Sequence, residues 1–410
     1  MSLSKIEGLI SNELDALKAS GAFKGNEMVI TGVLQSHDSK GPRYLIEGYG
    51  DMEFIRMNSN GYLGMGLRPD VITAEELAVR EFGVGPGAVR FISGTYKPHI
   101  ELEQKLAKFH QKEACLIFSS AYTAVMSILV TLISKDTTVI SDSLNHNCII
   151  NGVKLSQPKD KKIYKHNNMI ELESTVKECI GNCKRILLVT DGIFSMRGDH
   201  APLSAIADIA EKYEHEFEEG IITIVDDSHG VGAIGETGRG TLELTKENRI
   251  DILIATLGKA LGVNGGYLAA TAKVIAYLRE KAPFYIYSNP ITAAEARAAA
   301  KALEVLDSSE GKELLKYLRE TIAYFRKSLI DIGYETIEGE HPVVPLMVRD
   351  TKKTVELVEY LKTNGILSTG LSYPIVPRGD EEIRFQICAA HTRYDIDCVL
   401  KVLNTYKVTH

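Results

Sequence analysis

Five short apolar runs recur along the middle of this chain, and the stretches between them have the apolar spacing of helices. The runs cover residues 115–118, 138–141, 186–190, 221–225 and 252–255. Parallel strands need a crossover connection, which is usually a helix. The alternation therefore predicts an α/β fold with a mainly parallel central sheet and helices on both faces. In such sheets a ligand binds at the carboxyl ends of the strands, so the residues that follow each run are the first candidates for a site.

The residues that follow these runs are rich in groups that can do chemistry. They are Ser119, Ser120 and Ala121; Asn145 and His146; Asp191 and Ser195; Asp226 to His229; and Thr256 and Lys259. Lys259 stands in TLGKALGVNGGY, where small residues leave room for a planar ligand near the backbone. Partial burial lowers the pKa of such a lysine and makes it a competent amine for a Schiff base. A surface lysine in a glycine-rich loop is the ordinary alternative for Lys259 alone.

This set matches the needs of a cofactor whose pyridine ring acts as an electron sink. Such a ring needs a carboxylate at its nitrogen, which Asp226 can supply, and an amine for its aldehyde, which Lys259 can supply. His146 is placed to stack on a ring face, and His229 to reach the ring hydroxyl oxygen. Each residue also has an ordinary structural explanation, such as a capping aspartate or a hydrogen-bonded core histidine. Their joint occurrence at one sheet edge favours the cofactor site.

A phosphate group on such a cofactor would need an anion cradle. The backbone N–H groups of Ala121 and Tyr122 open a predicted helix after a polar strand end, and the N-terminus of a helix binds anions. The hydroxyl of Thr256 is expected at the same edge. The glycine-rich stretch 83–90 does not predict a dinucleotide site, because no strand precedes it and Ala88 stands where the fingerprint has glycine.

Composition and charge argue against several other classes of protein. Of the 410 residues, 44% are hydrophobic and 25% are charged, which is typical of soluble globular proteins. The net charge is −7 and the two signs are interleaved, which argues against general nucleic-acid binding. Residues 1–24 have an amphipathic helical pattern without a continuous apolar core, so we expect neither a signal peptide nor a membrane span. These features predict a cytoplasmic protein.

The six cysteines predict neither a disulfide framework nor a metal site. No CxxC pair occurs. Cys179 and Cys183 stand four residues apart in a helical stretch, but the neighbourhood lacks the two further ligands that a metal would need. We therefore expect no metal at the site.

The length of the chain predicts two or three domains. We expect an N-terminal helix and extended arm over residues 1–57, a large cofactor domain over 58–290, and a smaller α+β domain over 291–410. The last region is predicted to hold an alanine-rich helix at 291–307, strands at 343–348 and 383–387, and helices at 354–364 and 394–406.

Several segments resemble a known family. VDDSHGVGAIGETGRG, TLGKALGVNGGY, SDSLNHNCIINGVKLS, VTDGIFSMRGDHAPL and VRFISGTYKPHIELEQKL closely resemble the α-oxoamine synthases, which are pyridoxal 5'-phosphate (PLP) enzymes that condense an amino acid with an acyl-CoA. The resemblance runs from about Asn58 to His391. It implies an α/β fold of the PLP-dependent transferase type I, like aspartate aminotransferase. It also implies a homodimer with the active site at the subunit interface.

The resemblance assigns roles to residues that match the family's motifs. Lys259 would be the Schiff-base lysine, Asp226 the partner of the pyridinium nitrogen, and His146 the stacking ring, while His229 and Ser195 would lie near the ring hydroxyl. Asn60 in NSNGYLG and Arg384 in EIRFQI match positions near the amino-acid carboxylate. The residues that match the phosphate site are Ala121, Tyr122, Thr256 and, from the second subunit, Tyr287 and Ser288.

Within the family, the motifs are most similar to those of glycine C-acetyltransferase, also called 2-amino-3-ketobutyrate CoA ligase. That likeness implies glycine and acetyl-CoA as substrates and 2-amino-3-ketobutyrate as the product. Val125, Cys148 and Arg197 depart from the usual pattern of such enzymes. Two alternatives stay open: a decarboxylating synthase of the 8-amino-7-oxononanoate synthase or serine palmitoyltransferase type, and an aminotransferase of the same fold.

Overall fold

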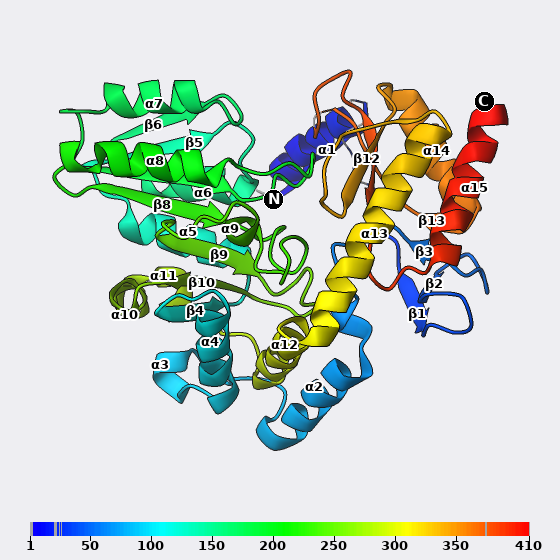
Figure 1. Ribbon diagram of the computed structural model, residues 1–410, viewed down its shortest axis with the longest axis horizontal. Helices are drawn as coiled ribbons and strands as arrows, with labels where there is room; N and C mark the ends of the chain where they lie inside the picture. Colours follow the sequence, from blue (N-terminus) through cyan, green and yellow to red (C-terminus); the bar gives the residue numbers. More distant parts are fainter. Residues whose placement is uncertain (1–2, 20–22, 24, 26, 374, 410) are drawn as a thin grey trace.

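The computed structural model describes residues 3–19, 23, 25, 27–373 and 375–409, and within them the largest sheet has seven strands in the order β4-β10-β9-β8-β7-β5-β6 (Figure 1). Strand β10 is antiparallel to both of its neighbours, and the other strands of this central sheet run parallel to one another. The strands are β4 (Ala114–Phe118), β5 (Thr137–Asp142), β6 (Asp160–Tyr164), β7 (Arg185–Asp191), β8 (Ile221–Asp226), β9 (Ile252–Thr256) and β10 (Gly266–Ala270). The predicted mainly parallel α/β fold is thus confirmed.

Helices cover both faces of the central sheet (Figure 1). In β7, Leu187 and Val189 pack on one side with helices α5 and α6, while Ile186 and Leu188 pack on the other side with α7 and α8. Because both faces are buried, the strands have continuous apolar sequences rather than alternating ones. The helices of this region are α2 (Pro69–Phe82), α3 (Arg90–Ser93), α4 (Lys97–Phe109), α5 (Ala121–Leu132), α6 (Asn147–Ser156), α7 (Met169–Glu178), α8 (Leu203–Tyr213), α9 (Thr241–Leu244), α10 (Ala272–Lys281), α11 (Pro283–Ile286) and α12 (Ala293–Leu306).

The C-terminal part forms the predicted smaller α+β domain. Its antiparallel sheet has the order β11-β12-β15-β14, and three helices pack against it. The strands are β11 (Glu335–Thr336), β12 (Val343–Met347), β14 (Thr369–Leu371) and β15 (Glu382–Gln386), and the helices are α13 (Ser309–Asp331), α14 (Thr351–Thr363) and α15 (Arg393–Thr409).

The N-terminal arm packs on this C-terminal domain. Strands β1 (Ile30–Leu34) and β2 (Arg43–Ile46) form an antiparallel pair, and β3 (Ile55–Arg56) pairs in parallel with β13 (Ile366–Leu367). A buried ion pair of 2.5 Å joins Arg43 to Asp395 of α15. The boundaries 1–57, 58–290 and 291–410 stay a prediction.

Helix α1 (Leu3–Ala19) precedes the arm and buries none of its side chains. Its apolar residues therefore face outward, among them Leu3, Leu9 and Leu14. Across the described residues, no helix is long and apolar enough to cross a membrane.

Candidate active site

A cavity of about 210 Å³ lies at the carboxyl edge of the central sheet. The segments that follow β4, β5, β7, β8 and β9 meet around it, as the strand order requires. Its lining residues are Ser120, Ala121, Tyr122, His146, Cys148, Asp191, Ile193, Ser195, Asp226, Ser228, His229, Thr256 and Lys259. The structure therefore brings together the predicted cofactor residues, with the exception of Tyr287 and Ser288.

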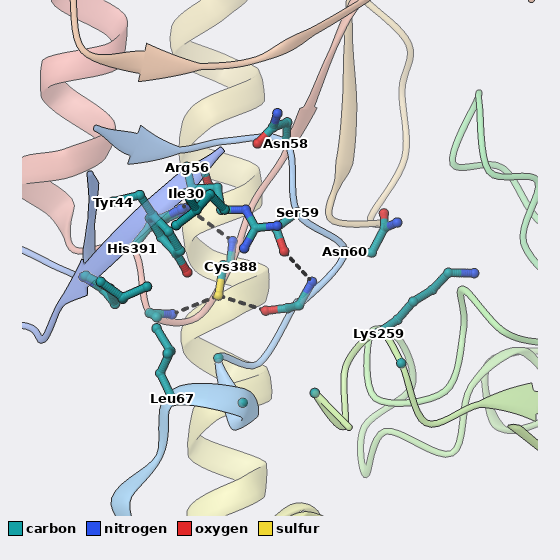
Figure 2. Close-up of a pocket in the computed structure, with 18 residues that line it drawn as sticks. Ile30, Tyr44, Arg56, Asn58, Ser59, Asn60, Leu67, Lys259, Cys388 and His391 are labelled. Atoms are coloured by element: carbon teal, nitrogen blue, oxygen red, sulfur yellow. Dashed lines mark hydrogen bonds between the residues drawn. The ribbon is translucent and has the colours of Figure 1, made fainter. Parts of the chain in front are cut away.

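Lys259 follows β9 and lines both this cavity and a larger adjoining pocket of about 560 Å³ (Figure 2). Burial lowers the pKa of Lys259, although the carboxylates of Asp226 and Asp191 act in the opposite direction. A lowered pKa increases the fraction of uncharged amine, which is the form that attacks a carbonyl carbon.

The glycines near Lys259 make room for protein backbone. Gly262 has a φ of 70°, and a Cβ there would lie 2.3 Å from the nitrogen of Gly66. A Cβ on Gly266 would lie 2.1 Å from the nitrogen of Ala121. The expectation that these small residues make room for a ligand is therefore wrong for Gly262 and Gly266. Instead, they let the Lys259 loop and β10 pass close to neighbouring segments of the site.

Two aspartates end neighbouring strands at the cavity. Asp226 of β8 and Asp191 of β7 are register partners. Asp226 accepts a hydrogen bond of 3.1 Å from the N–H of Ser228, and Asp191 accepts one of 2.9 Å from the N–H of His146. Burial, together with the charge of Asp226, raises the pKa of Asp191 well above its ordinary value. The negatively charged form of Asp191 is thus disfavoured at this edge of the cavity.

His146 caps the first turn of α6. Its Nδ1 accepts a hydrogen bond of 3.2 Å from the N–H of Cys148, so this nitrogen carries no proton. Burial lowers the pKa of His146, and Lys259 adds to that effect while Asp226 opposes it. An uncharged imidazole suits contact with the face of an aromatic ring, which is the predicted role.

His229 follows Asp226 by three residues and is buried. Burial and the positive charge of Lys259 lower its pKa well below the ordinary value. Its ring contacts the hydroxyl of Tyr62, and its carbonyl accepts a hydrogen bond of 2.8 Å from His341. The imidazole is therefore neutral and held in one orientation at the wall of the cavity.

The first turn of α5 provides the predicted anion cradle. Ser120 caps the helix and, with Thr123, forms a capping box that uses the N–H of Thr123. The N–H groups of Ala121 and Tyr122 have no carbonyl partner within the helix, because the first turn lacks preceding residues. Thr256 lies beside this turn in the lining of the cavity, with its hydroxyl hydrogen-bonded to the carbonyl of Gly265. These N–H groups, together with the positive end of the α5 dipole, can hold a phosphate, and the Thr256 hydroxyl can donate to it by giving up its bond to Gly265.

Arg384 contacts Asn60, which lines the adjoining pocket, but Arg384 itself is not among the residues that line this pocket. Asn60 lines this pocket with Lys259 (Figure 2), and its side-chain oxygen lies 3.4 Å from Nη2 of Arg384. Gln386 donates to the same oxygen over 3.2 Å. The Nε of Arg384 is buried without a hydrogen-bond partner, so the guanidinium has donors left for a carboxylate.

Comparisons with known proteins identify the family. The model for class I and II aminotransferases matches residues 52–403. A curated 8-amino-7-oxononanoate synthase from Bacillus pumilus is 38% identical over 395 residues, covering 96% of each chain, and one from Thermosipho melanesiensis is 36% identical with the same coverage. The chain belongs to the α-oxoamine synthases. Because PLP is the cofactor of this family, the predicted cofactor is confirmed.

Solved structures agree with this assignment. A serine palmitoyltransferase from Sphingomonas wittichii superposes with a TM-score of 0.88 at 26% identity, covering 99% of this chain and 98% of that one. The enzyme from S. paucimobilis, solved with a bound PLP–myriocin aldimine, superposes with a TM-score of 0.86 at 26% identity and the same coverage. The aminotransferase-like fold is therefore confirmed. The finer prediction of glycine C-acetyltransferase receives no support from these names, which favour the decarboxylating alternative.

The residues of this α-oxoamine synthase fit PLP. The buried hydroxyl of Ser228 has no hydrogen-bond partner at the cavity wall, next to the carboxylate of Asp226. An amine, a carboxylate and a helix N-terminus line the same space, and these are the groups that an aldehyde, a pyridine nitrogen and a phosphate require. The donor set thus matches the three polar ends of the cofactor.

Tyr287 and Ser288 do not line the cavity of their own chain. They follow α11, and the side chain of Tyr287 is 78% exposed. Their predicted contribution from a second subunit stays a prediction.

Sequence reasoning missed several residues that line or support the site of this α-oxoamine synthase. Ser228 stands in the predicted group Asp226 to His229 but was given no role, and Cys148 was noted only as a departure from the family pattern. Tyr62 stands in the motif NSNGYLG, which was singled out only for Asn60, and His341 comes from a distant segment that had no signal in the sequence. Among the described residues, no group of three or more His, Cys, Asp or Glu side chains could hold a metal ion.

Proposed function

We propose that this enzyme uses PLP to condense an amino acid with an acyl thioester, acyl-CoA, in the cavity beside Lys259. The observation that carries the proposal is the shared lining of one small cavity by Lys259, Asp226 and the first turn of α5. The adjoining pocket, which Lys259 lines together with Asn60, offers space for the amino acid.

Lys259 and Asp226 carry the central roles. PLP, when bound, supplies a sink for the electron pair released at the α-carbon of the amino acid. The Asp226 carboxylate would keep a proton on the ring nitrogen, which makes that sink effective. Lys259 would attach to the aldehyde carbon through Nζ and, once the amino acid has replaced it, remove the proton from the α-carbon. Its lowered pKa suits it to act as that base.

The other residues hold the cofactor in place. His146 would lie against one face of the ring, and His229 and Ser195 would lie near the ring hydroxyl. The N–H groups of Ala121 and Tyr122 and the hydroxyl of Thr256 would bind the phosphate. From a second subunit, Tyr287 and Ser288 would complete the phosphate site.

Arg384 would hold the carboxylate of the incoming amino acid. Its guanidinium can bind both oxygens at once, with Asn60 beside it. A fixed carboxylate selects which bond of the α-carbon stands perpendicular to the cofactor ring, and so which bond breaks first.

A third pocket, of about 610 Å³, provides room for the acyl group. His146 and Ser195 belong both to this pocket and to the cofactor cavity. Its apolar lining residues are Leu144, Phe194, Met196, Ile337, Met347, Ile375, Val376 and Pro377. A pocket of this size and character supports an acyl chain longer than acetyl.

We further propose that the carboxylate of the amino acid is lost as carbon dioxide. The names of the curated relatives and of the structural neighbours support this decarboxylating reaction. Glycine C-acetyltransferase, in which the carboxylate is retained, stays as a second candidate because the motifs VRFISGT and VDDSH favour it. An aminotransferase would have no use for the acyl pocket.

The test is a panel of glycine, alanine and serine against acyl-CoA thioesters of increasing chain length, read by thiol release. Each amino acid carries a label in its carboxyl group. Thiol release with an equal amount of labelled carbon dioxide supports the decarboxylating synthase. Thiol release from acetyl-CoA with the label retained in a keto acid, trapped by reduction, supports glycine C-acetyltransferase. Amino-group transfer to a keto acid without thiol release contradicts both.

We also propose that the enzyme is a homodimer whose sites lie at the interface. The exposed Tyr287 and the apolar residues of α1 support this arrangement. Mixing inactive Lys259→Ala protein with a weakly active Tyr287→Ala variant should restore activity, because one site of each mixed dimer is then intact. A monomer in sedimentation experiments, with no restoration on mixing, contradicts the proposal.

A further inference from the structure

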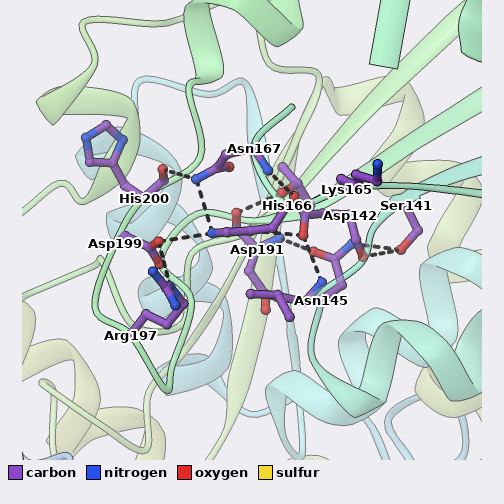
Figure 3. Close-up of polar contacts among 12 residues, drawn as sticks. Ser141, Asp142, Asn145, Lys165, His166, Asn167, Asp191, Arg197, Asp199 and His200 are labelled. Carbon is purple, nitrogen blue, oxygen red and sulfur yellow. Dashed lines mark hydrogen bonds and ion pairs between the residues drawn. The ribbon is translucent and has the colours of Figure 1, made fainter. Parts of the chain in front are cut away.

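His166 lies between two carboxylates, Asp142 at the end of β5 and Asp199 in the segment that follows β7. Its Nδ1 is 3.1 Å from Asp142 Oδ1, and its Nε2 is 3.0 Å from Asp199 Oδ2 (Figure 3). The ring also meets Phe194 edge to face, with 4.3 Å between the ring centroids. His166 itself follows β6, the strand at the end of the central sheet. One side chain thus connects three segments of the carboxyl edge.

The two contacts require a protonated ring. A carboxylate only accepts hydrogen bonds, so making both bonds at once requires a proton on each ring nitrogen and therefore a cationic imidazole. The amide nitrogen of Asn167, 3.3 Å from Nε2, then donates to the carbonyl of His200 instead. Burial alone would lower the pKa of His166, but the hydrogen bonds to Asp142 and Asp199 outweigh it and raise the pKa to about 9. Arg197 also faces this cluster, donating to Asp199 over 3.2 Å.

On one side of His166, Asp142 organises the turn that leads to His146. Its Oδ1 accepts a hydrogen bond of 2.8 Å from the N–H of Leu144, and its Oδ2 accepts one of 2.9 Å from the N–H of Asn167. Asn145, in the same turn, accepts from the N–H of Asp191 over 2.9 Å. The position of His146 in the cofactor cavity therefore depends on this turn.

On the other side, Asp199 closes a hairpin that carries Ser195. The carbonyl of Asp199 accepts a hydrogen bond of 3.0 Å from the N–H of Phe194, and Ile193 forms a β-bridge with His200. Residues 193–200 otherwise extend from the end of β7 toward the acyl pocket, where Phe194, Ser195 and Arg197 line the wall.

We propose that His166 is a positioning residue that, as a doubly hydrogen-bonded cation, holds the Asp142 turn and the 193–200 hairpin together and so places His146 and Ser195 at the cofactor cavity. His166 lines none of the three pockets described above and acts through these two loops. Its catalytic consequence rests on the proposed function, whereas its effect on the hairpin does not.

The pH dependence follows from the sign of the pKa shift. The folded-state pKa of His166, about 9, lies above the ordinary histidine value of about 6.5. The two bonds of His166 therefore stabilise the folded state in full below about pH 6.5, and this stabilisation is lost as the pH rises through about 9. Asp142, Asp199 and Arg197 are the charged groups that face the ring, and none of them is replaced in the first variant below.

The experiment compares His166→Gln with the full-length wild type and with His215→Gln, a control in which the replaced histidine is exposed. Hydrogen–deuterium exchange, read by mass spectrometry without added PLP, should be at least about 10-fold faster in residues 193–200 of His166→Gln. With PLP added, the dissociation constant of the cofactor should rise about 10-fold, and kcat/KM should fall about 10- to 100-fold. His215→Gln should match the wild type in all three measurements.

A second variant separates the charge from the shape of the ring. His166→Arg keeps a cation with several donors, so it should restore protection of the hairpin and hold it above pH 9, where the wild type loses it. Combining His166→Gln with Asp199→Asn should lower the protection of residues 193–200, expressed as a free energy, by less than the sum of the two single changes. The reason is that both changes remove the same contact.

Several outcomes would overturn the proposal. His166→Gln could match His215→Gln in the exchange of residues 193–200, or it could accelerate exchange equally in β7 and β8, which would indicate a general loss of stability. Failure of His166→Arg to restore protection would also count against it. A wild type that binds no PLP would instead contradict the proposed function. The exchange data would still test whether His166 holds the Asp142 turn and the 193–200 hairpin together.

Discussion

The hydroxyl oxygen of Tyr62 lies 2.8 Å from Nδ1 of His229, and the same hydroxyl donates to Asn60 over 3.2 Å. Burial raises the pKa of Tyr62, so it keeps its single proton, which can serve only one of these neighbours. Both contacts are hydrogen bonds only if Tyr62 donates to Asn60 and His229 donates from Nδ1 to Tyr62. This assignment leaves Nε2 of His229 as an acceptor and links the cofactor cavity to the Asn60 and Arg384 pair.

Replacing Tyr62 by Phe should therefore weaken both halves of the site. The buried Nδ1 of His229 loses its partner, which costs about 1 to 3 kcal/mol of unfolding free energy. We expect kcat/KM for the amino acid to fall about 10-fold, with a rise in the KM of the amino acid, because Asn60 also loses a donor. Chemical denaturation and steady-state kinetics measure the two effects. Wild-type kinetics in Tyr62→Phe would show that the hydrogen bonds of Tyr62 with His229 and Asn60 do not affect catalysis.

Asp226→Asn should still bind the cofactor but lose most turnover. A neutral side chain no longer keeps a proton on the ring nitrogen, so we expect kcat to fall about 100-fold or more, on the order of 3 kcal/mol. Asp227→Asn is the matched control, because Asp227 accepts hydrogen bonds from the N–H and hydroxyl of Thr241 and does not line the cavity. That control should lose stability rather than turnover. Near-normal turnover in Asp226→Asn would contradict its role.

The central sheet could be predicted because its strands are buried on both faces and so leave continuous apolar runs. Strand β6 was missed because it lies at the edge of the sheet, where its sequence DKKIY keeps polar residues. Strand β10, GYLAA, was missed because its small residues sit in a glycine-rich stretch. Its glycine is explained by the close passage of Ala121, which only the folded structure reveals.

The candidate site could be predicted to the extent that the strand order places the ends of the strands next to one another. Lys259, Asp226 and His146 each follow a strand, so the sheet order alone brings them to one edge. Contacts made across long sequence separations left no local pattern. Arg384 and Asn60 are 324 residues apart, and their contact depends on how the C-terminal domain docks.

Lys259→Ala should abolish the colour of the enzyme. A covalent link between a lysine and the cofactor aldehyde absorbs visible light, so wild type with PLP should be yellow, and borohydride should fix the cofactor on Lys259. The variant should bind PLP without that absorbance, and its turnover should fall at least about 100-fold because it also lacks the base. Lys246, which lines a different pocket, provides the control as Lys246→Ala. Fixation of the cofactor on another lysine would overturn the assignment of Lys259.

Arg384→Lys should lower the affinity for the amino acid and leave the cofactor absorbance unchanged. Lysine keeps the positive charge but cannot bind both carboxylate oxygens in a fork, so we expect the KM for the amino acid to rise about 10-fold or more. A looser carboxylate also relaxes the choice of the bond that stands perpendicular to the ring. The ratio of labelled carbon dioxide to released thiol should therefore change in this variant, which carboxyl-labelled substrate can measure. An unchanged KM together with an unchanged ratio would show that another group binds the carboxylate, with Asn60→Ala the next variant to test.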